Sequence, residues 1–270
     1  MPGRGVILSN DSLKYLETEL QSADLALANL ESALTTESPA TSGGYNLCAS
    51  PDSARILTES GLDMLSIVNN HSLDCGIQGH LDTLSALESN DLIAIDESGH
   101  TTTINDLKLT FFAYEDVSKP LDLLGVTQSI QAAHSNGSIV IVSIHWGMEY
   151  QGGASERQKE LAEQFATAGA TVIWGHHPHV LQPAEWIPAG CAESQDKTGC
   201  SLVLYSLGNA LFDQAGLPDT HRSALVSVVL DKNGIVSTQA TPFLIDPIHS
   251  LLIAPDKNTS DLILSHLHLH

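Results

Sequence analysis

The 270-residue sequence predicts an α/β fold, a single domain over residues 1–270 with its sheets covered by helices. Helix-like and strand-like segments alternate through the first two thirds of the chain, and the last third is mainly strand-like, as in an antiparallel sheet. Hydrophobic residues make up 42% of the chain, which is enough for one sizeable core or two small ones. No linker, repeat or low-complexity stretch divides it.

The first half alternates between short helices and apolar strands. Residues 9–23 begin with Ser, Asn and Asp, which favour a helix start, and a strand is expected over 24–31. Residues 50–61 carry an early proline and a final glycine, the pattern of a short helix. A strand over 62–70, a helix over 77–90, a strand over 92–95 and a hairpin over 101–115 with an Asn-Asp turn then follow.

The second half continues the alternation and then becomes strand-rich. Residues 126–137 and 155–170 predict helices, and the strand over 138–147 is rich in β-branched residues and uncharged. Further strands are expected over 171–175, 179–187, 201–209 and 222–243, the last turning back at 231–234. The tail over 260–270 ends in alternating His and Leu, as in an edge strand or in residues appended to a natural chain, and we assign it no ligand role.

Charge and hydropathy limit the partners. The formal charge is −21, with the acids spread along the chain, so the surface repels nucleic acid and anionic membranes. It also repels polyanionic substrates unless metal ions or a local basic pocket reverse the sign in the site. No run of 18 apolar residues is present, and the first residues lack the apolar core of a signal peptide.

The four cysteines contain no C-x-x-C pair, which argues against a structural zinc knuckle. Cys191 and Cys200 bracket a polar, turn-like segment, so a disulfide between them is expected and would imply an oxidising compartment. Two free thiols at these positions are the alternative.

Polar clusters follow the predicted strands where they end, and in α/β sheets ligands gather beyond the carboxyl ends of the strands. Taken singly, each cluster could be a turn, a helix cap or a satisfied core residue. Their coincidence at successive strand ends, including the H-x-H of "GHHPH", favours a site for zinc, manganese or iron. The residues are Asn29, Glu31, Asn69, Asn70, His71, Asp74, His145, Trp146, Glu149, His176, His177, His179 and Asn209.

Five motifs occur in order: "NLESALTT", "NNHSLDCGIQGHLDTLSAL", "HWGMEY", "GHHPHVLQPAE" and "YSLGNALFDQ". Together they resemble the CapA (PgsA-like) family of bacterial capsule and poly-γ-glutamate synthesis proteins, a family similar to calcineurin-like metallophosphoesterases. The resemblance is strongest over residues 1–243, with 244–270 as a tail. It implies a four-layer αββα sandwich around one or two divalent metal ions, Mn, Zn or Fe.

The resemblance also implies roles for individual residues. His71 would be the general acid, positioned by Asp74. Glu31 stands where the phosphoesterases place a bridging aspartate. The implied metal ligands are Glu31, Asn70, His145, His177 and His179, and the implied substrate-binding residues are Arg4, Asn29, Trp146, Glu149, His176 and Asn209.

Two functional classes stay open. One is a non-hydrolytic factor in the synthesis, export or anchoring of an anionic polymer such as poly-γ-glutamate. The other is a metal-dependent hydrolase acting on a phosphoester or polymer bond. Expected partners are an anionic polymer or a phosphorylated small molecule, with other capsule-synthesis proteins at the extracytoplasmic face of the membrane, and no nucleic acid. The start "MPGRGV" resembles the end of the family's opening motif, so we expect the first β-strand and its metal carboxylate to be missing.

Overall fold

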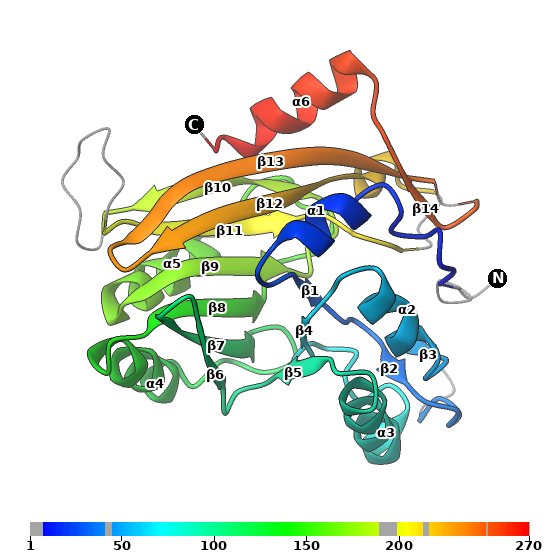
Figure 1. Cartoon of the computed structure of the whole chain (residues 1–270), viewed down its shortest axis with the longest axis horizontal. Helices are drawn as coiled ribbons and strands as arrows, with labels where there is room; N and C mark the ends of the chain where they lie inside the picture. Colours follow the sequence, from blue (N-terminus) through cyan, green and yellow to red (C-terminus); the bar gives the residue numbers. More distant parts are fainter. Residues whose placement is uncertain (1–7, 41–44, 189–198, 213–215, 247, 270) are drawn as a thin grey trace.

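The computed structural model describes residues 8–40, 45–188, 199–212, 216–246 and 248–269. Across these ranges the chain is a mixed α/β structure with parallel sheets (Figure 1). The helices are α1 (Glu17–Ser22), α2 (Ser53–Glu59), α3 (Gly76–Glu88), α4 (Leu123–Ser135), α5 (Glu156–Ala168) and α6 (Lys257–Leu267), with a 3-10 turn η1 (Pro218–His221). The strands are β1 (Leu27–Asn29), β2 (Ala33–Leu34), β3 (Cys48–Ala49), β4 (Met64–Ser66), β5 (Ile93–Ile95), β6 (His100–Ile104), β7 (Leu107–Glu115), β8 (Ile139–His145), β9 (Ala170–His176), β10 (Leu181–Ile187), β11 (Ser201–Leu207), β12 (Arg222–Asp231), β13 (Gly234–Asp246) and β14 (Leu251–Ile253).

A six-stranded sheet forms one half of the fold, in the order β10-β11-β9-β8-β7-β6. Its four central strands are parallel, and the two edge strands are antiparallel to their neighbours. The central strands read as continuous apolar runs because both of their faces are buried. Strands β8 and β9 are in register at their carboxyl ends, which sets His145 beside His176.

A second parallel sheet, β1-β4-β5, lies on the other side of the molecule, and β12-β13-β14 forms a third, antiparallel sheet (Figure 1). Side chains of β7, β8, β9 and β11 pack against β4, β5 and β13 in a core between the sheets. Because the strands of β1-β4-β5 and the central strands of the large sheet are both parallel, the loops after their carboxyl ends can meet.

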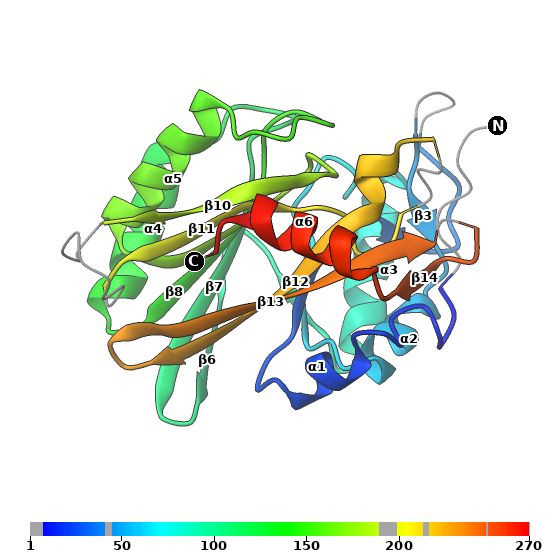
Figure 2. The same ribbon diagram turned by 90° about the horizontal axis from the view of Figure 1, so that it is seen from above.

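The helices cover the outer faces of these sheets. Helices α4 and α5 bury a core of aromatic and aliphatic side chains against the large sheet, and α1, α2 and α3 contribute to a second core against β1 and β4. Helix α6 lies across β13 and β10 (Figure 2). No helix in the described ranges is long and apolar enough to cross a bilayer.

Several expectations from the sequence are confirmed. Asn105 and Asp106 both have positive φ, 49° and 65°, as a two-residue type I′ hairpin turn requires. The helix predicted over 155–170 is α5, which begins after a capping box formed by Ser155 and Gln158. The β12–β13 hairpin turns at the predicted place.

Two expectations about elements are wrong. The tail is helix α6 rather than an edge strand, because Asp256 caps its N-terminus and Ile263 and Leu267 are buried. The helix predicted over 9–23 is α-helical only from Glu17, with turns before it. The expected missing first strand concerns residues outside the described ranges, and it stays a prediction.

A disulfide joins Cys48 of β3 to Cys75, the residue before α3, with the Cα atoms 6.2 Å apart. This bond was not anticipated from the sequence. It fixes the loop that carries His71 and Asp74 to the two-stranded β2-β3 sheet. The predicted Cys191–Cys200 pair lies outside the described residues, since Cys191 is not among them.

Replacing both cysteines, Cys48→Ser with Cys75→Ser, should lower the free energy of unfolding by roughly 3 kcal/mol, the value expected for closing a loop of this length. The bond spans 27 residues of sequence. Urea unfolding of the double variant and the wild-type protein, both without reductant, measures the difference. Equal free energies of unfolding would show that the bond does not stabilise the fold.

Candidate metal centre

The candidate site lies where the carboxyl ends of the two parallel sheets meet. Glu31 follows β1, Asn70 and His71 follow β4, and His145 ends β8. The side chain of Asn70 bridges the two sheets, with its Oδ1 2.7 Å from Nε2 of His145. The loop "HHPH" after β9 completes the site.

A carboxyl oxygen of Glu31 stands at the centre of these residues. Its Oε1 lies 3.6 Å from Nε2 of His179, 3.7 Å from Nε2 of His145 and 4.0 Å from Nε2 of His71. The same oxygen is buried and has no hydrogen-bond partner among the described residues. Burial, with smaller contributions from the charges of Glu149 and Asp74, raises the pKa of Glu31 to about 8. An unpartnered oxygen ringed by nitrogen donors is the arrangement that a bound cation would satisfy.

The imidazoles around this oxygen are held neutral. Burial, reinforced by neighbouring histidines, lowers the pKa of His177 to about 4 and that of His145 well below its usual value. Burial likewise lowers the pKa of His179. Only the neutral ring has a lone pair to give to a metal, so the environment favours the coordinating form.

The backbone of the "HHPH" loop is strained. His177 and His179 have φ of 101° and 59°, in the left-handed region that non-glycine residues rarely adopt. The backbone N–H of Tyr150, in the loop after β8, donates to the carbonyl of Pro178 at 2.8 Å. Such strain persists only where the surroundings impose it, and here it aims both rings at Glu31.

His71 has the partner that the sequence predicted. Its Nδ1 lies 2.7 Å from Oδ2 of Asp74, and its Nε2 faces Glu31. The backbone N–H of Leu47 also donates to Oδ2 of Asp74, at 2.6 Å, which fixes that carboxylate. This geometry holds the His71 ring with Nε2 toward the site.

Three of the residues predicted to bind substrate lie close to Glu31 or its neighbouring histidines. Asn209 accepts a hydrogen bond from Nδ1 of His179 at 2.8 Å, which orients that ring with Nε2 toward Glu31. Asn29 donates to Oε2 of Glu31 at 3.3 Å. Glu149 is exposed, and its charge acts on Glu31, His177 and His179.

Two of the residues predicted to bind substrate, Trp146 and His176, are buried. Trp146 is fully buried, and its indole N–H donates to the carbonyl of Tyr205 at 2.9 Å, so it packs in the core. His176 is also buried, and both of its ring nitrogens face the protein, Nδ1 toward His145 at 2.6 Å and Nε2 toward Ser143 at 2.8 Å. It therefore supports His145 rather than a substrate. Arg4 lies outside the described residues.

Ser143 and Asn69 belong to the site's support, but neither was given a role from the sequence. Asn69 donates to Oδ1 of Asn29 and to the carbonyl of Leu30, at 3.2 and 2.9 Å. Ser143 precedes His145 by two positions on a strand, and side chains two apart share a face. The alternation of side chains along the strand therefore indicates from the sequence that Ser143 lies on the same face as His145.

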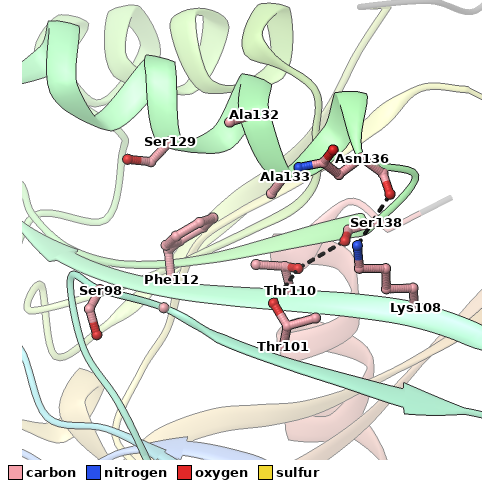
Figure 3. A pocket seen from close by; sticks show the side chains of 11 residues that line it. Ser98, Thr101, Lys108, Thr110, Phe112, Ser129, Ala132, Ala133, Asn136 and Ser138 are labelled. Carbon is pink, nitrogen blue, oxygen red and sulfur yellow. Dashed lines mark hydrogen bonds between the residues drawn. The ribbon is translucent and has the colours of Figure 1, made fainter.

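A separate hollow lies between α4 and the β6–β7 hairpin, and Figure 3 shows the side chains that line it. Lys108 donates to the carbonyl of Asn136, and Thr110 donates to Ser138. It contains none of the candidate site residues. Its lining includes no histidine, cysteine or carboxylate, so it offers no comparable set of donors.

The residues present fit a divalent metal ion. Glu31, His177 and His179 each offer one ligand atom, and these atoms lie within 4.8 Å of one another. Two ligands of a tetrahedral zinc ion are roughly 3–4 Å apart, as the usual bond lengths of about 2.0–2.2 Å require, so the set would contract by up to about 1 Å around a bound ion. Imidazole and carboxylate donors together suit zinc, manganese or iron.

Comparison with known proteins gives one family. A family model described as bacterial capsule synthesis protein PGA_cap matches residues 7–214. The PGA biosynthesis protein CapA of Bacillus subtilis (strain 168) is 30% identical, over 92% of this chain and 67% of that protein. The capsule biosynthesis protein CapA of Bacillus anthracis is 28% identical, over 91% and 64%. The chain thus spans about two thirds of the length of these relatives.

The fold is also similar to that of solved structures. One of them is the crystal structure of a hypothetical protein from Thermus thermophilus, with a TM-score of 0.56 and 16% identity. The match covers 89% of this chain and 97% of that one. At this identity the likeness concerns the fold alone.

We expect Gly175→Ala to disturb the "HHPH" loop. A Cβ at Gly175 would overlap the indole nitrogen of Trp146 and the carbonyl oxygen of Tyr205. Overpacking of this kind costs about 1–3 kcal/mol and should also weaken metal binding by shifting His176 and His177. Thermal unfolding and a metal titration measure both effects.

The matched control is Gly152→Ala, because a Cβ there would meet nothing within 4 Å. Unchanged stability and metal affinity in Gly175→Ala would show that the loop does not depend on close packing at this glycine.

Proposed function

Because the chain belongs to the bacterial capsule synthesis protein family, we propose that it acts in making, exporting or anchoring an anionic capsule polymer such as poly-γ-glutamate. The setting of that work is the cell envelope, with other capsule-synthesis proteins as partners and no nucleic acid. The observation that carries the chemical part of the proposal is the buried Oε1 of Glu31 among imidazole nitrogens, with no hydrogen-bond partner in the described part of the chain.

Glu31, His177 and His179 would hold a divalent ion, and His145 and Asn70 offer further donor atoms beside them. A bound ion would supply Lewis acidity toward a carboxylate, carbonyl or phosphoryl oxygen. Asn209 keeps His179 turned toward the ion through its hydrogen bond to Nδ1. Manganese, zinc and iron are all compatible with these donors.

The charges around the site make the ion important for an anionic ligand. Asp74 and Glu149 are acidic residues whose charges act on the site, and the whole chain has a formal charge of −21. A polyanion would be repelled by this surface unless a cation reverses the local sign. The proposed role therefore predicts that polymer binding requires metal.

Hydrolysis of a phosphoester or polymer bond is the second candidate function, and the His71–Asp74 pair favours it. Asp74 holds Nδ1 of His71 at 2.7 Å, which leaves Nε2 to carry a proton toward a leaving group in the site. The carboxylate also stabilises the positive charge of the ring while it holds that proton. Removal of a positioned acid of this kind costs ~10²–10⁴-fold in rate.

The fold is compatible with this assignment. We propose that the large sheet and the opposing sheets, with their covering helices, correspond to a four-layer αββα sandwich of the metallophosphoesterase type, in one domain over residues 1–270. The core between the sheets supports this proposal.

The proposed function is tested by binding of purified protein to immobilised poly-γ-glutamate with Mn²⁺ or with chelator. We expect retention with Mn²⁺ and loss of retention with chelator, because the acidic site repels the polymer when no cation is bound. His179→Ala should lose the Mn²⁺-dependent part, and Ser201→Ala, a buried strand residue away from the site, should keep it. Equal retention with and without metal would refute a metal-mediated role.

The hydrolase candidate is tested by turnover of an aryl phosphate with added Mn²⁺. His71→Ala should reduce turnover ~10²–10⁴-fold and leave metal bound, since the ring acts as an acid rather than as a ligand. His177→Ala should instead lower metal affinity, by at least the ~10–100-fold typical of losing a supporting residue. Equal metal loss in both variants would make His71 a ligand, and no wild-type turnover would leave the non-hydrolytic role.

A further inference from the structure

Two buried residues outside the proposed ligand set form a chain behind His145. Ser143 Oγ lies 2.8 Å from Nε2 of His176, and Nδ1 of His176 lies 2.6 Å from Nδ1 of His145. On its other side, Nε2 of His145 lies 2.7 Å from Oδ1 of Asn70. The parallel register of β8 and β9, which pairs His145 with His176, creates the contact between the rings.

The number of protons on this chain is fixed. Both rings are buried, with the His145 side chain fully enclosed, so each is neutral and carries one N–H proton. The Nδ1···Nδ1 contact needs one proton, because two nitrogen lone pairs at that distance repel each other. The ring that supplies this proton carries its N–H on Nδ1 and has none on Nε2. The other ring must then carry its N–H on Nε2, so the tautomer of one ring sets the tautomer of the other.

Two arrangements satisfy these contacts. In the first, the Ser143 hydroxyl donates to His176, His176 Nδ1–H donates to His145, and His145 Nε2–H donates to Asn70. In the second, the bonds along the chain are reversed: His145 Nδ1–H donates to His176, and His176 Nε2–H donates to Ser143. Only the second leaves a lone pair on Nε2 of His145.

We propose that His176 is a positioning residue that, together with Ser143, sets the tautomer of His145 and thereby decides whether its Nε2 can bind the metal. This inference rests on the metal centre of the proposed function. The hydroxyl of Ser143 can either donate or accept, so it closes the chain in both arrangements.

Binding of a cation would select the second arrangement. Without a proton on Nε2 of His145, that nitrogen and Oδ1 of Asn70 face each other as two lone-pair donors 2.7 Å apart. Nδ1 of His177, 3.1 Å from that Nε2, can donate to it, but the shorter contact with Oδ1 of Asn70 is then left as two facing lone pairs, so the metal-free protein holds the first arrangement.

The change between the two arrangements conserves protons. His145 releases the proton on Nε2 to water and gains the one that His176 held on Nδ1. His176 in turn takes up one proton from water on Nε2, and the hydroxyl of Ser143 rotates from donor to acceptor. Each ring therefore stays neutral with one N–H, and only the tautomers exchange.

The variants separate this role from simple packing. His176→Leu fills the space but offers no acceptor to Nδ1 of His145. His145 then favours the tautomer with its proton on Nε2, where it donates to Oδ1 of Asn70. Zn²⁺ affinity should fall ~10–100-fold, as for other residues that orient a metal-binding histidine. His176→Asn returns a carboxamide oxygen near the position of Nδ1 and should recover much of that affinity.

Ser143→Ala removes the far end of the chain and should weaken Zn²⁺ binding less than His176→Leu does. Its matched control is Ser201→Ala, a buried serine on β11 whose hydroxyl donates to the carbonyl of Ala170. Thermal unfolding of each metal-free variant reports whether the fold is kept.

The experiment is a Zn²⁺ titration against a competing chelator, together with ¹⁵N NMR of the histidine rings. We expect Nε2–H on His145 in the metal-free wild-type protein and Nδ1–H when Zn²⁺ is bound. His176→Leu binding Zn²⁺ as tightly as wild type, or His145 already as Nδ1–H without metal, would overturn the role. Equal losses in His176→Leu and His176→Asn would also overturn it, since packing alone would then explain the effect. A wild-type protein that binds no Zn²⁺, Mn²⁺ or Fe²⁺ would refute the proposed function and this role together.

Discussion

The rest of the site depends on one constraint, the burial of the Glu31 carboxyl among histidines, with no lysine or arginine bonded to it in the described ranges. A carboxylate taken from water without a counter-charge is costly, and here the cost appears as a pKa raised to about 8. The same burial lowers the pKa values of the surrounding imidazoles. A divalent ion would resolve both, because it lets the carboxyl ionise and uses the lone pairs of neutral rings.

This arrangement is held by neighbours rather than by the donor residues themselves. Asp74 holds His71, Asn209 holds His179, and His176 with Ser143 holds His145, each through a ring nitrogen that points away from Glu31. The orientation of these three imidazoles is thus fixed by hydrogen bonds on the side of each ring that faces away from Glu31. The supports come from different strands and loops, so the site exists only when both sheets are packed together.

The strained backbone at His177 and His179 is also held in place by neighbouring residues. Two non-glycine residues with positive φ are tolerated because the loop is anchored by close contact at Gly175 and by the hydrogen bond from Tyr150 to Pro178. The Cys48–Cys75 bond anchors the opposite wall, beside Asp74. Stability of the surrounding fold is therefore used to hold the side chains in position.

The sequence by itself determined the alternation of helices and strands and the hairpin turn at Asn105 and Asp106, because these follow from local periodicity and short spacings. The His71–Asp74 pairing was implied by the family resemblance. The sequence also predicted which strand ends carry the polar residues that meet. Only the tertiary structure decided the side-chain directions: Trp146 and His176 turn inward because β8 and β9 are covered on both faces. The Cys48–Cys75 pairing likewise depended on how distant segments pack, which no local pattern encodes. The helical tail was missed because alternating His and Leu fits a strand in isolation, whereas burial of Ile263 and Leu267 against the sheet favours a helix.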